Sequence, residues 1–180
     1  MDAGLDTGPI LTQNKIVVEQ RETAGSLYEK LSEMSAKLLV STLKKYINGE
    51  IQPIQQDHNQ ATYAKELKKS DGKIHWGKPA DEIERLVRGM HPWPGTFTKA
   101  SFTRKKQKYD YHLKITEVDP APVDALPFKV GEVFEYGNRM AVQCGDGALV
   151  INKLQPEGKK EMKSEEFLCG NSEIIGTILH

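Results

Sequence analysis

The strongest pattern in the first third of the chain is that of an amphipathic helix. Between Ala24 and Asn48, apolar residues recur at steps of three and four, which places them on one helical face: Leu27, Leu31, Met34, Leu38, Tyr46 and Ile47. Thr23 is a suitable N-cap, and Asn48-Gly49 is a suitable end. Upstream, residues 8–20 are rich in β-branched side chains and predict an extended segment. Because one helix cannot bury its apolar face alone, we expect a partner sheet preceding this segment.

After residue 50 the pattern changes. Residues 51–70 are polar and lack helical or strand periodicity, which predicts a linker. In the remainder, 71–180, a short helix is expected over 80–89 and a last one over 163–170, with Ser164 as its N-cap. Between them lie brief strand-like segments separated by turn signals, a pattern typical of a small antiparallel barrel: 96–103, 109–118, 131–136, 140–143 and 148–154. The fold class predicted is α+β, mostly β.

Composition limits the possible classes of function. The chain has 180 residues with 25 basic and 25 acidic side chains, so its overall charge does not favour nucleic acid. Residues 64–112 nevertheless hold 12 basic and 6 acidic side chains. No apolar run reaches the roughly 20 residues that a bilayer-spanning helix needs, and no secretory signal is recognisable, so we expect a cytoplasmic protein without a membrane partner. Neither cysteine has a metal-ligand neighbour, which predicts no metal site.

The first candidate for chemistry is an aspartate between two glycines. Gly4, Leu5, Asp6, Thr7 and Gly8 form a Gly-x-Asp-x-Gly sequence, where missing Cβ atoms allow close approach of backbone and substrate. An isolated motif of this kind is more often an ordinary turn in which the aspartate caps its own backbone. The alternative is a catalytic carboxylate held in a loop.

Longer motifs decide between these two interpretations. The loop stands in MDAGLDTGPIL and is followed by the helix sequence TAGSLYEKL. Downstream come ATYAKELKKSDGKIHW, RLVRGMHPWPGTFT and DGALVINKLQPEGKKEMKSEEFLCG, in that order. Together these segments resemble the C-terminal portion of the methionyl-tRNA formyltransferases, a family of folate-dependent formyltransferases, over nearly the whole chain. Only residues 104–140 follow no pattern of the family, as a loop-bearing part of a barrel would.

The resemblance implies a role for each part. Residues 1–50 would be the end of a Rossmann-like catalytic domain, 51–70 a linker, and 71–180 an OB-like barrel that binds initiator methionyl-tRNA. Asp6 would be a catalytic residue, supported by its loop neighbours, and would act beside an asparagine and a histidine from an upstream segment. The formyl donor would be 10-formyltetrahydrofolate, and no metal would be needed. Every histidine of this chain follows the motif, so none is assigned that role.

Three basic clusters are candidates for contact with RNA phosphates. They comprise Lys65, Lys68 and Lys69; Arg104, Lys105, Lys106 and Lys108; and Lys159 and Lys160. Most charge runs are merely solvated faces, but three clusters brought together by folding would form a stripe that binds an RNA backbone. Trp93, between two prolines, is expected to plug one end of the barrel, although its indole could also stack on a base.

The leading hypothesis is therefore part of an enzyme that formylates methionyl-initiator-tRNA, inactive as this chain alone. Two alternatives stay open: a stand-alone RNA-binding barrel, and a segment of a nucleotide-sugar formyltransferase. DNA is not an expected partner. An uncovered apolar helix face would also favour self-association.

Overall fold

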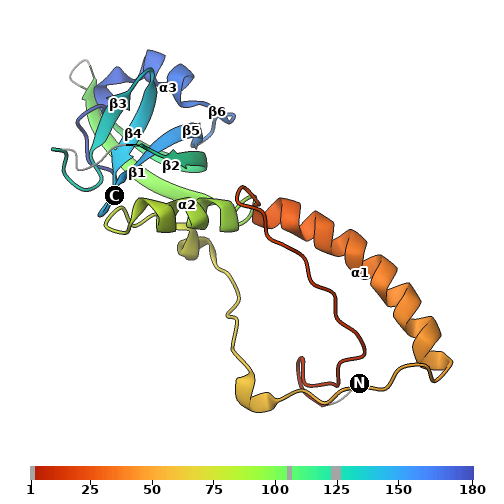
Figure 1. Ribbon diagram of the computed structural model, residues 1–180. Coiled ribbons are helices and arrows are strands. Elements are labelled where there is room, and N and C mark those ends of the chain that lie inside the picture. The colour runs from red at the N-terminus through yellow and green to blue at the C-terminus, as the bar shows by residue number, and fades with distance from the viewer. Residues whose placement is uncertain (1–2, 105–106, 123–126) are drawn as a thin grey trace. The chain divides into compact units, whose positions relative to one another are not determined.

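The computed structural model describes residues 3–104, 107–122 and 127–180 and divides into two compact units, Met1–Glu66 and Leu67–His180 (Figure 1). Each unit is described by itself. The three-part division predicted from the sequence, with bounds at 1–50, 51–70 and 71–180, stays a prediction. In the described part of the chain, no helix is both long and apolar enough to cross a membrane.

The first unit contains an extended segment, helix α1 (Ala24–Ile47) and the short helix η1 (His58–Gln60). As predicted, Thr23 caps α1: its hydroxyl accepts from the Ser26 N–H at 3.1 Å, and the Ser26 hydroxyl accepts from the Thr23 N–H at 3.1 Å. Glu22 beside this cap accepts a hydrogen bond from Lys30 at 2.6 Å and another from Ser26, and both lower the pKa of its carboxyl group. The start of α1 is therefore fixed by side chains within the unit.

The apolar side chains of α1 are only partly covered in this unit: Leu27, Met34 and Leu38 are half-buried, and others stay exposed. Leu39, Tyr46 and Ile47 are 59%, 45% and 81% exposed. Among the described residues of the unit, only Glu22 and Thr42 are buried, and both are polar. The amphipathic pattern thus correctly gave a helix, but the unit holds no apolar core.

The second unit is a curled antiparallel sheet with helices packed against it (Figure 1). Its strands are β1 (Thr96–Arg104), β2 (Gln107–Pro120), β3 (Val133–Tyr136), β4 (Arg139–Gln143), β5 (Ala148–Pro156) and β6 (Met162–Lys163). Its helices are η2 (Lys69–Gly72), α2 (Ala80–Gly89), α3 (Ser164–Gly170) and η3 (Ser172–Ile174). The strand order is β1-β2-β5-β4-β3, with β6 paired to β5. Register shifts around Glu117 form an irregularity in β2, a feature that bends a strand.

The core of this unit lies on the inner face of the curled sheet. Helix α2 packs against β2 and helix α3 against β4. Buried side chains come from all of these elements: Ile74, Ile83, Val87, Leu113, Ile115, Met140, Leu149, Ile151, Leu154 and Phe167. Trp76 joins them, and its indole N–H donates to the buried Thr98 hydroxyl at 3.0 Å. Burial alternates in the middle of β2, whereas β4 buries three consecutive residues and β5 four, so both faces of these two strands are covered.

The C-terminal segment, residues 176–180, connects the two edge strands. The Val133 N–H on β3 donates to the Thr177 carbonyl at 2.8 Å. At the other edge, Lys99 on β1 and His180 exchange two backbone hydrogen bonds of 2.9 Å each. Leu179, 3% exposed, lies between these contacts and belongs to the core. The segment thus pairs edge groups that an open sheet would leave without partners.

Helix α2 starts beside a close contact between two loops. The Gly145 N–H donates to the Trp76 carbonyl at 2.9 Å and to the Lys78 carbonyl at 3.0 Å. A Cβ atom on Gly145 would stand 2.0 Å from the carbonyl oxygen of Gly77, a distance that real atoms do not adopt. Only glycine allows this approach, which fixes the loop before α2 against the β4–β5 turn.

Two local expectations were wrong. Ser164 is the first residue of α3 rather than its N-cap, because its hydroxyl accepts from the Met140 N–H of β4 at 3.4 Å instead of capping the helix. Trp93 is 58% exposed and does not plug the sheet, since the turn that carries it projects the indole into solvent. The predicted α2 over 80–89 and the five predicted strands are present, with bounds that differ by zero to two residues at each end.

We expect the C-terminal segment to be essential for the stability of the second unit. Leu179→Ala should lower the free energy of unfolding by about 2–4 kcal/mol, because it empties a fully packed site. The neighbouring Ile178→Ala, at a position 38% exposed, should cost less than about 1 kcal/mol and serves as the control. Urea denaturation followed by circular dichroism measures both, and equal losses would contradict the assignment.

A second stability prediction concerns Gly145. Gly145→Ala should destabilise the unit by about 1–3 kcal/mol, because the added methyl group meets the Gly77 carbonyl and forces the loop away. Gly170→Ala is the matched control, since a Cβ there would have no atom within 4 Å. The shift in the midpoint of urea denaturation compares the two variants, and a Gly145→Ala midpoint equal to that of the control would refute the close contact.

Candidate functional site

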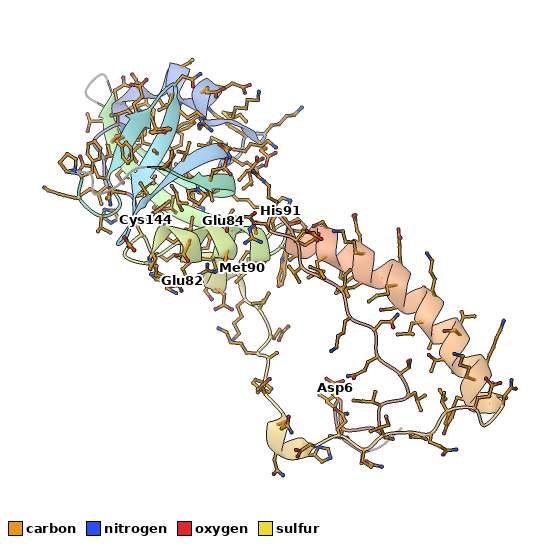
Figure 2. The ribbon with its side chains drawn as sticks, in the orientation of Figure 1. Asp6, Glu82, Glu84, Met90, His91 and Cys144 are labelled. Carbon is orange, nitrogen blue, oxygen red and sulfur yellow. The ribbon has the colours of Figure 1, made fainter. Side chains whose placement is uncertain are left out.

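The loop that carries Asp6 has a special backbone conformation. Gly4 has a φ of +116° and Asp6 a φ of +56°, which is the left-handed region that residues other than glycine seldom occupy. Aspartate tolerates this region better than most residues do. The Thr7 hydroxyl donates to the Ala3 carbonyl at 3.2 Å across the turn. In the described part of the chain, no side chain pairs with the exposed Asp6 carboxylate, which is labelled in Figure 2.

A residue that the sequence did not single out holds this loop. The side-chain amide of Gln56 donates to the backbone carbonyl of Asp6 at 3.0 Å and to that of Gly8 at 2.6 Å. Nearby, Ile10 and Ile54 exchange two backbone hydrogen bonds of 2.8 Å each. The segment after α1 therefore fastens the aspartate loop at two points, across almost fifty residues of sequence. No sequence signal marks Gln56, because glutamine is common in polar segments.

Asp6 lies in a pocket of about 880 Å³ formed within the first unit. Asp57 and His58 also line it. Hydrogen bonds from the Gln60 side chain and from the Asn59 backbone lower the pKa of Asp57, so this second carboxylate is ionised at neutral pH. With Glu66, the pocket thus offers three carboxylates and an imidazole, a polar set capable of binding and deprotonating an amine.

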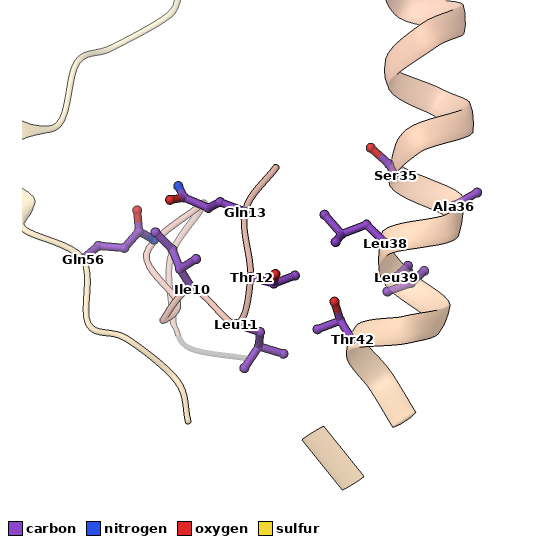
Figure 3. A pocket seen from close by; sticks show the side chains of 10 residues that line it. All are labelled: Ile10, Leu11, Thr12, Gln13, Ser35, Ala36, Leu38, Leu39, Thr42 and Gln56. Atoms are coloured by element: carbon purple, nitrogen blue, oxygen red, sulfur yellow. The ribbon is translucent and has the colours of Figure 1, made fainter. Parts of the chain in front are cut away.

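An apolar groove adjoins this pocket. It has a volume of about 750 Å³ and is lined by the extended segment and α1. Figure 3 shows Leu11 on the extended segment and Leu38 and Leu39 on α1. Ile10 and Gln56 line both this groove and the Asp6 pocket. Gln56 therefore stands at the boundary between a polar and an apolar cavity.

The candidate lysines fall into both units. Lys65 belongs to the first unit, whereas Lys68 and Lys69 begin the second, with the Lys68 N–H donating to Asp71 at 2.9 Å. Lys105 and Lys106 lie outside the described residues, and for Arg104 only the backbone at the end of β1 is described. These candidate cations lie at strand ends and in turns, and not in a buried site.

Strand pairing brings two of the clusters to one end of the sheet. Arg104 pairs with Gln107 at the tip of the β1–β2 hairpin. Because β5 runs antiparallel beside β2, the turn after β5, which holds Lys159 and Lys160, lies toward the same end. Lys108 already has a partner, since its ammonium group lies 3.3 Å from Asp110. Lys68 and Lys69 lie toward the opposite end, where β1 begins.

Further cations lie between these ends. On the outer face of β1 and β2, Lys99 pairs in register with His112, and Phe97 with Lys114. In the sequence these residues alternate with buried Thr98 and Leu113, so they do not form a run of adjacent charges. The structure therefore adds a basic strip along two strands.

The described residues contain no group of three His, Cys, Asp or Glu side chains placed to hold a metal ion. Cys144 is buried, and burial raises the pKa of its thiol to about 12, so it remains protonated and unreactive at neutral pH. Cys169 is exposed.

Known proteins similar to this chain share its sequence over almost its whole length. A family model described as formyl transferase, C-terminal domain, matches residues 66–172. The chain is 44% identical to the methionyl-tRNA formyltransferase of Lachnospira eligens, over 99% of this chain and 56% of that protein. It is 40% identical to the methionyl-tRNA formyltransferase of Desulfotalea psychrophila, over 94% of this chain and 50% of that protein. The chain thus spans about half the length of the curated relatives it matches.

Two solved structures share the fold. HypX from Aquifex aeolicus in complex with tetrahydrofolic acid superposes with a TM-score of 0.64 at 16% identity, over 94% of this chain and 28% of that one. The N-formyltransferase from Helicobacter canadensis, in complex with folinic acid and dTDP-3-aminofucose, gives 0.59 at 18% identity, over 90% and 53%. At such identities the likeness concerns the fold alone.

The family model covers more than half of the chain, from the start of the second unit into α3 and η3. The resemblance to methionyl-tRNA formyltransferases, predicted from the aspartate loop and the three downstream motifs, is confirmed by the relatives. The chain therefore belongs to the formyl transferase family and carries its C-terminal domain.

Proposed function

We propose that this chain is the C-terminal portion of an enzyme that transfers a formyl group from 10-formyltetrahydrofolate to the amino group of methionyl-initiator-tRNA. The observation that carries the proposal is the Asp6 loop, clamped by Gln56 beside a polar pocket. That loop stands in a chain 37–44% identical to methionyl-tRNA formyltransferases over 94–99% of its length. The cytoplasm is the compartment that this role in translation initiation implies.

Asp6 would act on the proton of the attacking amine. The amine nitrogen forms a bond to the formyl carbon, the bond from that carbon to N10 of the folate breaks, and one amine proton is transferred overall to N10. A carboxylate in the pocket can accept or orient that proton, and an upstream histidine and asparagine would stabilise the developing oxyanion. Gly4, Leu5, Thr7 and Gly8 would hold Asp6 in place.

A folate donor is compatible with the pocket. Its volume of about 880 Å³ and its polar lining suit the reacting end of a large, partly polar molecule. A neighbour of similar fold was solved in complex with tetrahydrofolic acid, which supports a folate-derived donor. The residues of this chain supply the proton-transfer group and no metal ligand set is needed.

The exposed face of α1 supports the assignment of the first unit to a Rossmann-like domain. Apolar side chains such as Leu39, Leu43 and Ile47 need a partner that removes them from water. In our proposal that partner is the remaining sheet of the catalytic domain, which would also bring the asparagine and histidine. Isolated, the chain would be inactive and would associate with itself through this face.

The second unit would be an OB-like tRNA-binding domain. Its basic strip and the cations at the ends of β1 could neutralise phosphates without reading sequence. The tRNA-binding residues proposed from the sequence are Lys65 of the first unit and, in the second unit, Lys68, Lys69, Arg104, Lys105, Lys106, Lys108, Lys159 and Lys160. A nucleotide-sugar substrate would not use such a strip, which favours tRNA over the sugar formyltransferases that share the fold.

The catalytic part of the proposal can be tested with a chimera. The upstream half of the Lachnospira eligens relative, joined to this chain, should formylate methionyl-tRNA, whereas this chain alone should not. Asp6→Asn in the chimera should lower kcat by about 10²- to 10⁴-fold, because proton transfer loses its carboxylate. Asp57→Asn, in the same pocket, should change kcat by no more than a few fold. If the Asp6→Asn chimera were as active as the unaltered chimera, the assignment would be contradicted.

The tRNA-binding part predicts a salt dependence. Replacing both Lys159 and Lys160 with glutamine should reduce the slope of log affinity for initiator tRNA against log salt by about 2, because about one counterion per lysine is no longer released. Lys129→Gln, an exposed lysine before β3, should leave the slope unchanged. Fluorescence anisotropy of labelled initiator tRNA at several salt concentrations measures this slope. A nucleotide sugar is added as a competitor in the same assay. Equal slopes for all variants would exclude these lysines from the interface.

A further inference from the structure

A small pocket in the second unit lies at the start of β1. Its volume is about 310 Å³, at the small end of the range that ligand pockets span. Four elements form it: helix η2, the turn before β1, the start of strand β1, and strand β2. The residues that line it include Lys69, Ser70, Gly95, Phe97, His112 and Lys114. All lie within one compact unit, so their mutual positions are those of a folded domain.

The side chain of Lys114 packs against the turn before β1. Gly95 is buried and has a φ of +77°, a conformation that favours glycine. A Cβ atom on Gly95 would lie 2.3 Å from Cε of Lys114 and 3.0 Å from its Nζ, so the lysine stem occupies the space that any other residue would fill. The lysine stem therefore passes close to the turn, and its ammonium group lies at the pocket.

An aromatic pair forms another wall of the pocket. The rings of Phe97 and His112 are stacked with centroids 4.8 Å apart and planes inclined by 22°. Both side chains are only partly buried and both line the pocket. Phe97 is paired in register with Lys114, so the ring stack and the ammonium group share one face of the hairpin. Such a stack offers a surface to a flat heterocycle.

The charge in this pocket is positive. Among the described residues, no carboxylate lines it, and neither Lys69 nor Lys114 forms an ion pair. The nearest acidic residue along the chain, Asp71, accepts a hydrogen bond from the Lys68 N–H within η2. Two uncompensated ammonium groups beside an aromatic surface suit an anion attached to a planar ring.

We propose that this pocket binds one unpaired nucleotide of the tRNA, with its phosphate between Lys69 and Lys114 and its base against the Phe97–His112 stack. The inference rests on the proposed function, which supplies the RNA. The pocket accommodates one nucleotide and not a duplex, and its ring wall tolerates any base. The exposed indole of Trp93 immediately precedes Pro94, which also lines the pocket, and provides a second surface for an adjacent base.

The two halves of the site have different signatures in a binding experiment. With the full chain and fluorescently labelled initiator tRNA, Lys114→Gln should weaken binding by about three- to tenfold and lower the salt slope by about 1. Phe97→Leu should weaken binding by about five- to tenfold with the slope unchanged, because stacking releases no counterion. Phe97→Tyr keeps the ring and should retain the affinity.

Matched controls separate binding from folding. Phe128→Leu removes another half-buried ring, which is stacked on Phe134 at 4.5 Å in a separate cluster, and should leave the affinity unchanged. Lys129→Gln is the control for charge. Thermal unfolding of each variant is measured alongside. If Phe97→Leu does not fold, the salt slope of tRNA binding by Lys114→Gln is the test of the nucleotide site.

The outcomes distinguish this inference from the function on which it rests. If the unaltered chain binds initiator tRNA but both pocket variants behave as their controls do, the nucleotide site is refuted and the tRNA interface remains. If the unaltered chain does not bind tRNA at all, both the nucleotide site and the proposed tRNA-binding function are refuted. Titration with a mononucleotide and with inorganic phosphate should shift the NMR signals of Lys114 in both cases, and those of the Phe97 ring only with the mononucleotide. A ring that does not respond to the mononucleotide refutes base stacking.

Discussion

An open antiparallel sheet has two edges whose backbone groups need partners, and this constraint shapes the second unit. The strand order β1-β2-β5-β4-β3 leaves β1 and β3 at the edges. Residues 176–180 hydrogen-bond to both, through Thr177 on one side and His180 on the other. Because that contact also buries Leu179 in the core, pairing and packing reinforce each other. The outer face of β1 and β2 is then left rigid and solvated, which is what a surface for binding a long polyanion requires.

In the first unit, by contrast, groups that need partners do not all find them. Helix α1 is well capped at Thr23, yet several of its apolar side chains, such as Leu39 and Ile47, stay exposed within the unit. What is fixed in this unit is the loop of Asp6, held by the side-chain amide of Gln56 rather than by packing. In the proposed function, further polypeptide would cover the exposed side of this helix and complete the active site around Asp6.

The elements could be predicted because each depends on local spacing. Helix α2 and five strands follow from periodicity and turn residues, and Thr23 from capping chemistry. Contacts distant in sequence could not be predicted: the bonds of Gln56 to the Asp6 loop, the use of the Ser164 hydroxyl by β4, and the tail between two edges. Trp93 was misjudged because an apolar residue between prolines looks like core unless the direction of the turn is known.

The chain has no net charge, and yet its proposed partner is one of the most highly charged polymers in a cell. At physiological salt a charge is screened beyond about 8 Å, so a bound phosphate responds to its immediate neighbours and not to the sum over the chain. Lys69 and Lys114 have no acidic neighbour in their pocket, whereas many acidic side chains elsewhere are engaged in their own pairs, as Glu84 is with Arg88. A neutral protein of this kind attracts RNA weakly from a distance. Its selectivity then depends on the fixed positions of a few cations and rings, which the turn at Gly95 and the pairing of β1 with β2 determine.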